Sequence, residues 1–364
     1  MQAPSARAAQ RVEERLARGG VAVELLRIPA AVFAAAAALR GALYDRGWLP
    51  SVRVEAPVIS VGNLTAGGSG KTPMVAWLAR RFLDRGARVG LLSRGYGAAK
   101  GEPGDEARML AELFPAAQQV QDRDRVRGAL ELVQRGVDVI VLDDGFQHRR
   151  LARELDLVLV DATRPWGLPG RRAENAPLLP RGLLRERPHA LARAQAVVLT
   201  RVDQARAAEL VALRAELARF APHAPVACAV HRPARVRSLR GETRAIESLR
   251  GESFDCVSAL GSPAAFERTL EDLGAQLVER RRFPDHHRYV AQDLAGLGAS
   301  GRPIVTSAKD AAKLSALELD RDVWVLDVEL ELVEGAPAIE AMLDALPPSR
   351  STRERAAFHE GLHG

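Results

Sequence analysis

Short apolar runs alternate with amphipathic stretches along most of the chain. The apolar runs, which we interpret as buried strands, are residues 57–62, 87–92, 137–142, 155–160 and 196–200. Helical patterns separate or follow them, at residues 73–83, 105–113, 124–135 and 204–219. Apolar strands that alternate with helices are typical of a parallel sheet with helices on both faces. The pattern therefore predicts an α/β fold for this region.

A second, smaller α/β lobe follows an extended, arginine-rich connector over residues 226–239. Its predicted strands are residues 254–260, 303–307 and 323–328. Its predicted helices are residues 263–273 and 337–345. A chain of 364 residues is too long for one compact core, which agrees with two domains.

The segment 21–48 is a candidate amphipathic helix with an apolar body. Arginines flank this body, and Tyr44 and Trp48 stand at its far end. Such a segment suits a helix that lies in a membrane surface, and it equally suits a helix packed on the protein's own core. Its apolar run, 28–39, is shorter than the roughly 18 residues that a spanning helix needs, so we expect it not to cross a bilayer.

These patterns give five expected segments. They are a basic extension (1–20), an interfacial helix (21–48), a core with a phosphate-binding loop (49–230), a smaller α/β lobe (231–345) and a charged tail (346–364).

A glycine-rich turn lies between the first predicted strand and the helix 73–83, and it is the strongest chemical signal. It reads Thr65-Ala66-Gly67-Gly68-Ser69-Gly70-Lys71-Thr72. Glycines let backbone N–H groups point inward, and with a helix N-terminus they form a cradle for phosphate. Lys71 would contact the β- and γ-phosphates of ATP, and the Thr72 hydroxyl would bind Mg²⁺. Thr65 stands where the usual P-loop pattern has glycine, so it departs from that pattern.

Two carboxylates follow a neighbouring apolar strand. Asp143 and Asp144 come directly after the apolar residues 139–142, at the strand end where α/β proteins place ligands. A P-loop enzyme needs such a carboxylate to hold Mg²⁺ or its water, although a turn aspartate is the plainer alternative. Gln147, His148 and Arg149 follow closely and are candidates to face the same cleft.

Two further polar groups are candidates for proton transfer. Asp105 begins a predicted helix, where a carboxylate is first of all a cap. Asp285 and His286 lie in the segment Phe283-Pro284-Asp285-His286-His287. A histidine beside a carboxylate can accept a proton, but the same pair also occurs in ordinary loops.

Composition narrows the class of partner. The net charge is +6, and most of the basic residues are arginine. An excess of arginine suits phosphate-bearing partners as well as a solvated surface. Aromatic residues are 4% of the chain, and no stacking platform for bases is visible, so we expect no nucleic-acid partner. The two cysteines form no CxxC pair, which excludes a cysteine zinc site.

Together these residues resemble the tetraacyldisaccharide 4'-kinases of lipid A synthesis over roughly residues 24–345. The motifs that carry the resemblance are Tyr44-Asp45-Arg46-Gly47-Trp48, the loop from Gly62 to Pro73, Ser93-Arg94-Gly95-Tyr96-Gly97, Gly104-Asp105-Glu106, Asp143-Asp144-Gly145-Phe146-Gln147-His148, Leu179-Pro180-Arg181-Gly182-Leu183-Leu184-Arg185-Glu186, Phe283-Pro284-Asp285-His286 and Lys309-Asp310. The loop of this family also lacks the first glycine, so Thr65 is expected there.

The resemblance implies transfer of the ATP γ-phosphate to the 4'-hydroxyl of a tetraacyldisaccharide 1-phosphate, which gives lipid IVA. It implies that Asp105 is the base, assisted by His286 and Asp285, while Asp143 and Asp144 handle Mg²⁺ with Thr72. The acceptor is an anionic lipid, which implies a peripheral enzyme at the cytoplasmic face of the bacterial inner membrane. Candidates for contact with the substrate are Arg94, Gln147, His148, Arg149 and Arg171.

Two other functions stay open at this point. Another P-loop enzyme, such as a small-molecule kinase or an amide-forming ligase, would need a soluble acceptor. A membrane-bound ATPase switch would hydrolyse ATP without any phosphorylated acceptor.

Overall fold

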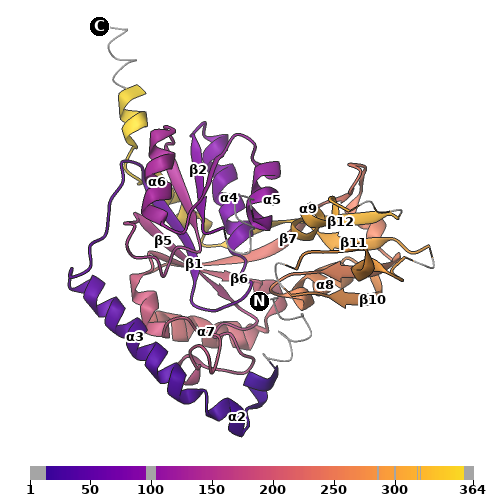
Figure 1. Ribbon diagram of the computed structural model, residues 1–364, viewed down its shortest axis with the longest axis horizontal. Coiled ribbons are helices and arrows are strands. Elements are labelled where there is room, and N and C mark those ends of the chain that lie inside the picture. Colours follow the sequence, from indigo (N-terminus) through magenta and orange to yellow (C-terminus); the bar gives the residue numbers. More distant parts are fainter. Residues whose placement is uncertain are drawn as a thin grey trace. The chain divides into compact units, whose positions relative to one another are not determined.

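The structure is a computed structural model that describes residues 14–95, 104–284, 287–298, 301–317, 319 and 321–355 (Figure 1). Its contacts divide the chain into two compact units. Unit 1 comprises Met1–Arg18, Gly97–Met109 and His231–Glu329, and unit 2 comprises Gly19–Tyr96, Leu110–Val230 and Leu330–Gly364. One change of unit falls at residue 230, where the sequence pattern also changes. The assignment of residues 97–109 to unit 1 and of the residues after 329 to unit 2 depends on long-range contacts. A division of the sequence into contiguous segments does not capture such contacts.

Unit 2 contains a parallel sheet, which confirms the predicted fold class. In spatial order its strands are the first part of β7 (Val226–Ser238), β6 (Ala196–Thr200), β5 (Leu155–Asp161), β1 (Val58–Asn63), β4 (Val139–Asp143), β2 (Val89–Ser93) and β3 (Gln118–Gln121). Strands β1, β4, β5 and β6 are buried along their whole length, as their continuous apolar runs require. Because the strands are parallel, their carboxyl ends meet at one edge of the sheet.

Helices cover both faces of this sheet. Its helices are α4 (Lys71–Asp84), α6 (Arg125–Gln134), α7 (Ala207–Phe220) and α10 (Ala336–Asp344). On one face, Leu213 and Leu217 of α7 pack with Val158 and Leu199 of the sheet. A separate cluster joins α6 to the sheet through apolar residues that include Leu132 and Ile140. Helix α6 begins where the Asp124 carboxylate accepts the Val126 N–H at 3.1 Å, a normal N-cap.

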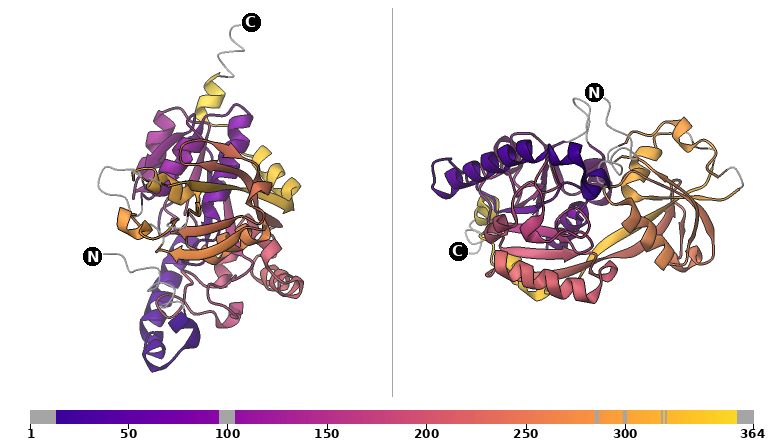
Figure 2. Two further views of the ribbon diagram at one scale, coloured as in Figure 1. Left: turned by 90° about the vertical axis from the view of Figure 1, so that its right-hand side faces the viewer. Right: turned by 90° about the horizontal axis from the view of Figure 1, so that it is seen from below.

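The N-terminal part of unit 2 is a long peripheral helix. It comprises α2 (Val21–Glu24) and α3 (Arg27–Asp45), and its outer side is uncovered (Figures 1 and 2). The helical segment Val21–Asp45 has 25 residues and a window of mean hydropathy 1.8, so by length and composition it could cross a bilayer. The length argument made from residues 28–39 alone was therefore wrong, because the alanines and apolar residues on either side extend the segment.

Unit 1 has its own core and a run of parallel strands. Its strands, in spatial order, are β10 (Gln276–Arg282), β9 (Ser253–Ser258), β11 (Ile304–Ser307) and the first part of β12 (Val323–Glu334). The short β8 (Thr243–Arg244) pairs with the end of β7 in antiparallel fashion. Helices α8 (Pro263–Asp272) and α9 (Ala308–Leu314) belong to this unit, and α5 (Asp105–Leu113) begins in it. Apolar clusters around Phe254 and Leu297 form its core.

The first residues of the predicted charged tail are folded against unit 2. Ser349 is buried, and residues 350–355 are helical. The Asp138 carboxylate accepts hydrogen bonds from Ser351 Oγ at 2.7 Å, Thr352 Oγ1 at 3.0 Å and Arg355 Nη2 at 2.7 Å. Burial raises the pKa of Asp138, but these bonds and one from the Arg88 N–H outweigh it and hold that pKa well below its usual range.

Candidate active site

The phosphate loop connects β1 to α4 at the carboxyl edge of the unit 2 sheet. Gly67 has a φ of 115° and Gly70 a φ of 89°, which favour glycine at these two turns. Gly70 is also the N-cap of α4, so the first turn of the helix is Lys71-Thr72-Pro73. The N-terminus of a helix directs its unpaired N–H groups at a bound anion. The predicted order of strand, glycine turn, lysine and helix is confirmed.

Polar side chains from β1 and β6 fix the shape of this loop. Asn63 donates from Nδ2 to Ser69 Oγ at 2.8 Å and accepts from Lys71 Nζ at 3.3 Å. Thr200 donates from Oγ1 to the Ser69 carbonyl at 3.0 Å, and Arg201 donates from Nη1 to the Gly68 carbonyl at 3.0 Å. Two loop carbonyls are thus bound on the β6 side, which keeps them away from the phosphate cradle.

Arg201 is itself held by a buried ion pair. Its guanidinium contacts the Asp161 carboxylate at the end of β5, and both side chains are less than one-tenth exposed. Asp161 also accepts from the Thr163 N–H at 3.0 Å and from Thr163 Oγ1 at 2.7 Å. Arg201 has a φ of 57°, a left-handed conformation that is uncommon outside glycine. The strained turn aims the guanidinium at the loop.

The start of the phosphate loop pairs with a distant segment of the chain. Thr65 and Leu184 form an antiparallel bridge. On either side of it, the Ala66 N–H donates to the Leu183 carbonyl at 2.7 Å, and the Arg185 N–H donates to the Leu64 carbonyl at 2.7 Å. The loop therefore begins with a short antiparallel ladder at the position where other P-loops have a glycine. Thr65 is part of this ladder.

The acidic pair lies next to the loop. Asp143 ends β4, with its Cα in register with Val61 of β1, and Asp144 follows with a φ of 53°. Asp144 is 3.5 Å from Lys71 Nζ, and Arg185 Nη1 lies 2.8 Å from each of its carboxylate oxygens. Burial raises the pKa of Asp144, but the charges of Lys71 and Arg185 outweigh it and set that pKa below its usual value. Asp144 is therefore an anion at neutral pH.

The donor set here suits magnesium. Among the described residues, no group of three His, Cys, Asp or Glu side chains could hold a metal ion by itself. Mg²⁺ is commonly bound by one or two carboxylates together with substrate phosphates and water. Asp143 and Asp144 supply hard oxygen atoms at the sheet edge, and Thr72 lies in the first turn of α4. These residues fit an ion that arrives with the nucleotide.

The candidates for substrate contact lie in different surroundings. Gln147 donates from Nε2 to the Asn63 carbonyl at 3.0 Å, so it belongs to the loop's support. His148 is half-buried, and burial together with nearby arginines lowers its pKa to about 4. Arg149 contacts α3 through Asp45. The charge of Arg171 helps Arg181 to lower the pKa of Glu24. Arg94 is exposed after the end of β2.

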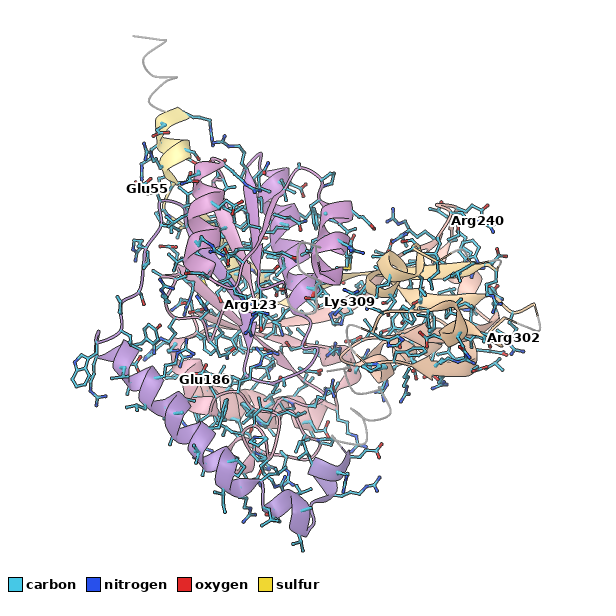
Figure 3. All side chains as sticks on the ribbon, viewed as in Figure 1. Glu55, Arg123, Glu186, Arg240, Arg302 and Lys309 are labelled. Carbon is cyan, nitrogen blue, oxygen red and sulfur yellow. The ribbon has the colours of Figure 1, made fainter. Side chains whose placement is uncertain are left out.

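Of the candidate proton-transfer residues, Asp105 belongs to unit 1. Asp105 begins α5, as the sequence predicts, while Asp285 and His286 lie outside the described residues. On either side of that pair, the His287 N–H donates to the Pro284 carbonyl at 3.0 Å. Next to Asp105, Glu106 accepts from Lys309 Nζ at 2.8 Å. Lys309 is labelled in Figure 3. The base role of Asp105 stays a prediction.

Comparison with known proteins now adds the family. The family model described as "Tetraacyldisaccharide-1-P 4'-kinase" matches residues 22–347. A tetraacyldisaccharide 4'-kinase of Anaeromyxobacter dehalogenans is 45% identical, with 89% of this chain and 91% of the relative covered. Another, of Geobacter sulfurreducens, is 36% identical, with 88% and 92% covered. The chain belongs to the tetraacyldisaccharide-1-phosphate 4'-kinase family.

A solved structure of this family supports the fold. LpxK from Aquifex aeolicus, solved in complex with ATP, superposes with a TM-score of 0.69 at 29% identity, covering 89% of this chain and 98% of that one. As a member of the family, the protein is an ATP-binding kinase of lipid A biosynthesis that phosphorylates the 4' position.

Three residues of this kinase site had no role in the sequence prediction. Arg185 stood in a quoted motif, but its pairing with Asp144 depends on the ladder between segments 64–66 and 183–185. Arg201 follows a predicted strand, and a basic residue after a strand carries no specific signal by itself. Arg125 is buried at the start of α6. Burial lowers the pKa of Arg125, and the negative charges of Asp144 and Asp143 act in the opposite direction. Its position after two aspartates reads simply as a helix start.

Proposed function

We propose that this kinase transfers the γ-phosphate of ATP to the 4'-hydroxyl of tetraacyldisaccharide 1-phosphate and so forms lipid IVA. The observation that carries the proposal is the cluster of Lys71, Asp144 and Arg185 beside the phosphate loop. Phosphoryl transfer depends chiefly on positioning and on neutralising phosphate charge, and this cluster supplies both. The family membership supplies the acceptor.

Among the described residues, ATP would replace two polar contacts of Lys71. Its ammonium group lies 3.3 Å from Asn63 Oδ1 and 3.5 Å from Asp144 Oδ1. When a triphosphate occupies the loop, Lys71 binds the β- and γ-phosphates, while the amides from Gly67 to Thr72 bind the adjacent oxygens. Arg185 stays beside Asp144 as a second positive charge at the same edge of the sheet. Both cations then offset the charge of the phosphate that is transferred.

Magnesium would be held by Asp143, Asp144 and the Thr72 hydroxyl. When bound, the ion would offset negative charge on the β- and γ-phosphates.

The 4'-hydroxyl must lose its proton during attack. We assign this proton to the Asp105 carboxylate, with His286 as its partner and Asp285 as the residue that orients His286. General-base help is worth about 10²–10⁴ in rate. Replacing Asp105 by Ala should lower kcat by about that factor and leave the KM for ATP within about twofold.

The matched control for Asp105→Ala is Glu112→Ala, which removes an exposed carboxylate from the same helix. Initial rates with γ-labelled ATP and the lipid acceptor measure both variants. Normal turnover of the Asp105 variant would remove this residue from the mechanism. A labelled inorganic phosphate product without labelled lipid would instead favour the ATPase switch.

The peripheral helix gives the enzyme its place at a membrane. Val21, Leu25, Ile28 and Val32 are each at least 66% exposed, although they are large and apolar. Apolar residues on one helical surface, with arginines and Trp48 beside them, suit the boundary between lipid headgroups and acyl chains. The acceptor is anchored in the same layer, and ATP is a cytoplasmic donor. We therefore place the enzyme on the cytoplasmic face of the inner membrane.

A helix that lies on the membrane fits better than one that crosses it. Glu24 at one end binds Arg181, and Asp45 at the other end binds Arg149. Both arginines belong to unit 2, so both ends of the helix are attached to the same folded unit. A spanning helix would have to release one of them to reach the opposite headgroup layer.

Vesicle sedimentation tests the membrane role. The triple variant Leu25→Gln, Ile28→Gln and Val32→Gln should lose binding to anionic vesicles, and its activity on acceptor in those vesicles should fall with it. A matched control carries Gln at Val211, Val290 and Val333, which are exposed elsewhere. Full vesicle binding by the first variant would refute the anchoring role and leave the kinase reaction untouched.

A further inference from the structure

Helix α3 makes little apolar contact with its own unit. Within Val21–Asp45, Val23 and Ala30 are the buried residues, and Ala34 packs partly against a core cluster. The apolar surface that alanine loses to such a contact is small, so apolar packing alone fixes the direction of the helix poorly. Charged contacts at its two ends supply what this packing lacks.

The first contact is made by Glu24. Its carboxylate accepts from Arg181 Nη2 at 2.8 Å, and the Arg181 side chain is only 8% exposed. The hydrogen bond from Arg181 lowers the pKa of Glu24. Arg27, at the start of α3, lies 2.5 Å from the other oxygen of Glu24. Glu24 therefore joins the start of the helix to a guanidinium that is nearly buried in unit 2.

The second contact is made by Arg149 at the far end of α3. Its Nη1 lies 2.7 Å from Asp45 Oδ1 and donates to the Gly41 carbonyl at 3.0 Å. The guanidinium carbon is 5.1 Å from the centre of the Tyr44 ring. Three groups of the last helical turns thus bind one arginine that is largely buried.

Both arginines are close in sequence to the phosphate site. Arg181 comes just before the segment 183–185, which pairs with the phosphate loop and ends in Arg185. Arg149 follows Gln147, which hydrogen-bonds the Asn63 carbonyl. Each end of the helix is therefore joined to the phosphate loop or its support by two contacts and a few residues of backbone.

We propose that the pairs Glu24–Arg181 and Asp45–Arg149 hold α3 at one angle, so that the membrane-bound kinase presents its phosphate loop to the lipid acceptor in a single orientation. This inference rests on the proposed membrane role. Glu24 and Asp45 are positioning residues, because they touch neither nucleotide nor acceptor and act through the orientation of the helix.

The leverage is large. A helix of 19 residues is about 28 Å long, so a tilt of about 20° moves its far end by about 10 Å. A displacement of about 1 Å at a reacting group can already cost about 10²-fold in rate. Loss of both pairs should therefore affect transfer at a membrane, where the helix sets the geometry. It should spare transfer in detergent micelles, where the acceptor is free to turn.

The test compares two full-length variants of equal charge. The first is the double variant Glu24→Gln and Asp45→Asn. The control, Glu174→Gln with Asp344→Asn, removes exposed ion pairs with Arg219 and Arg85 elsewhere in unit 2. For each we measure binding to anionic vesicles and initial rates with acceptor in vesicles and in detergent micelles. A third variant, Glu24→Asp with Asp45→Glu, keeps both carboxylates.

We expect the first variant to bind vesicles within about twofold of the native protein, because its apolar surface is intact. Its kcat in vesicles should fall by about tenfold or more, with the micelle rate unchanged. The control should match the native protein, and the conservative variant should recover most of the vesicle rate. Equal loss in vesicles and micelles, or no loss in either, would overturn the proposal.

Failure of the underlying function would look different. A native protein that ignores vesicles would remove the membrane role, and one that phosphorylates no lipid in micelles would remove the kinase reaction. Failure of the positioning role alone gives a third result. The native protein then binds vesicles and has normal rates in both media, and the double variant has the same rates.

Discussion

The contact between Arg201 and the phosphate loop leads to a quantitative prediction. Arg201→Met leaves the Asp161 carboxylate buried without its guanidinium partner and leaves the Gly68 carbonyl without its donor. Breaking a buried ion pair costs about 3–5 kcal/mol of unfolding free energy. Asp161 keeps its two bonds to Thr163, so we expect the lower end, about 3 kcal/mol.

The second effect concerns ATP. A hydrogen bond from a charged donor contributes about 1.5–3 kcal/mol. With about half of it expressed as loss of loop shape, ATP binding weakens by about 0.75–1.5 kcal/mol, which raises the KM for ATP by about 3- to 12-fold. The double variant Asp161→Asn with Arg201→Met removes the buried charge but not the defect at Gly68. It should recover about 2 kcal/mol of stability and keep the raised KM for ATP.

Urea unfolding and initial rates with saturating lipid acceptor in micelles measure the two effects separately. Leu343→Ala provides a control, because it removes buried apolar atoms from α10 and costs about 2–5 kcal/mol without touching the loop. Its KM for ATP should stay normal. The reasoning fails if Arg201→Met keeps the native KM, or if the double variant recovers its KM together with its stability.

Two further predictions concern stability, and one concerns the base. Deleting residues 349–364 removes the donors around Asp138 and should lower the free energy of unfolding, measured in urea, by about 2–4 kcal/mol. Because the folded pKa of Asp138 is depressed, its contribution to stability is present above about pH 4 and disappears as the pH falls further. The stability of the truncated protein should therefore fall less steeply with acid. The pKa of His148 is lowered to about 4, so the native protein loses stability as the pH falls from about 6.5 to 4. Over that range, the free energy of unfolding of His148→Gln should fall by up to about 3 kcal/mol less than that of the native protein. A native-like acid limb in either variant would contradict the corresponding assignment. The loss of turnover in Asp105→Ala completes the set.

The strands that carry the phosphate site followed closely from the sequence. Residues 58–63, 139–143 and 196–200 are mostly apolar, short and bounded by turns, and they form β1, β4 and β6 almost as predicted. These strands are buried on both faces, so their composition alone identifies them. The glycine loop was equally visible, because its conformation demands glycine at Gly67 and Gly70.

Elements at sheet edges were missed. Strand β3 (Gln118–Gln121) and strand β10 (Gln276–Arg282) are polar, since each lies at an edge and pairs on one side. Edge strands with charged side chains resist unwanted pairing, and this removes the apolar signal by which strands are found.

Helix α9 (Ala308–Leu314) was missed because so short a helix shows little periodicity.

The support of the loop could not be predicted for a different reason. Asn63, Thr200 and Arg201 contact the loop from two strands that are far apart in sequence. Their identities carry no motif, and their effect depends on the order β6-β5-β1 in the sheet. The ends of the peripheral helix pose the same problem, since Glu24 and Asp45 bind arginines more than a hundred residues away.

The central claim is that Lys71 and the phosphate loop deliver the γ-phosphate of ATP to a lipid acceptor. The most direct test is the rate at which Lys71→Met forms labelled lipid from γ-labelled ATP and tetraacyldisaccharide 1-phosphate in micelles. We predict a loss of about 10²-fold or more, because a charge that stabilises the transferred phosphate is gone. Formation of labelled lipid at the native rate would contradict the account.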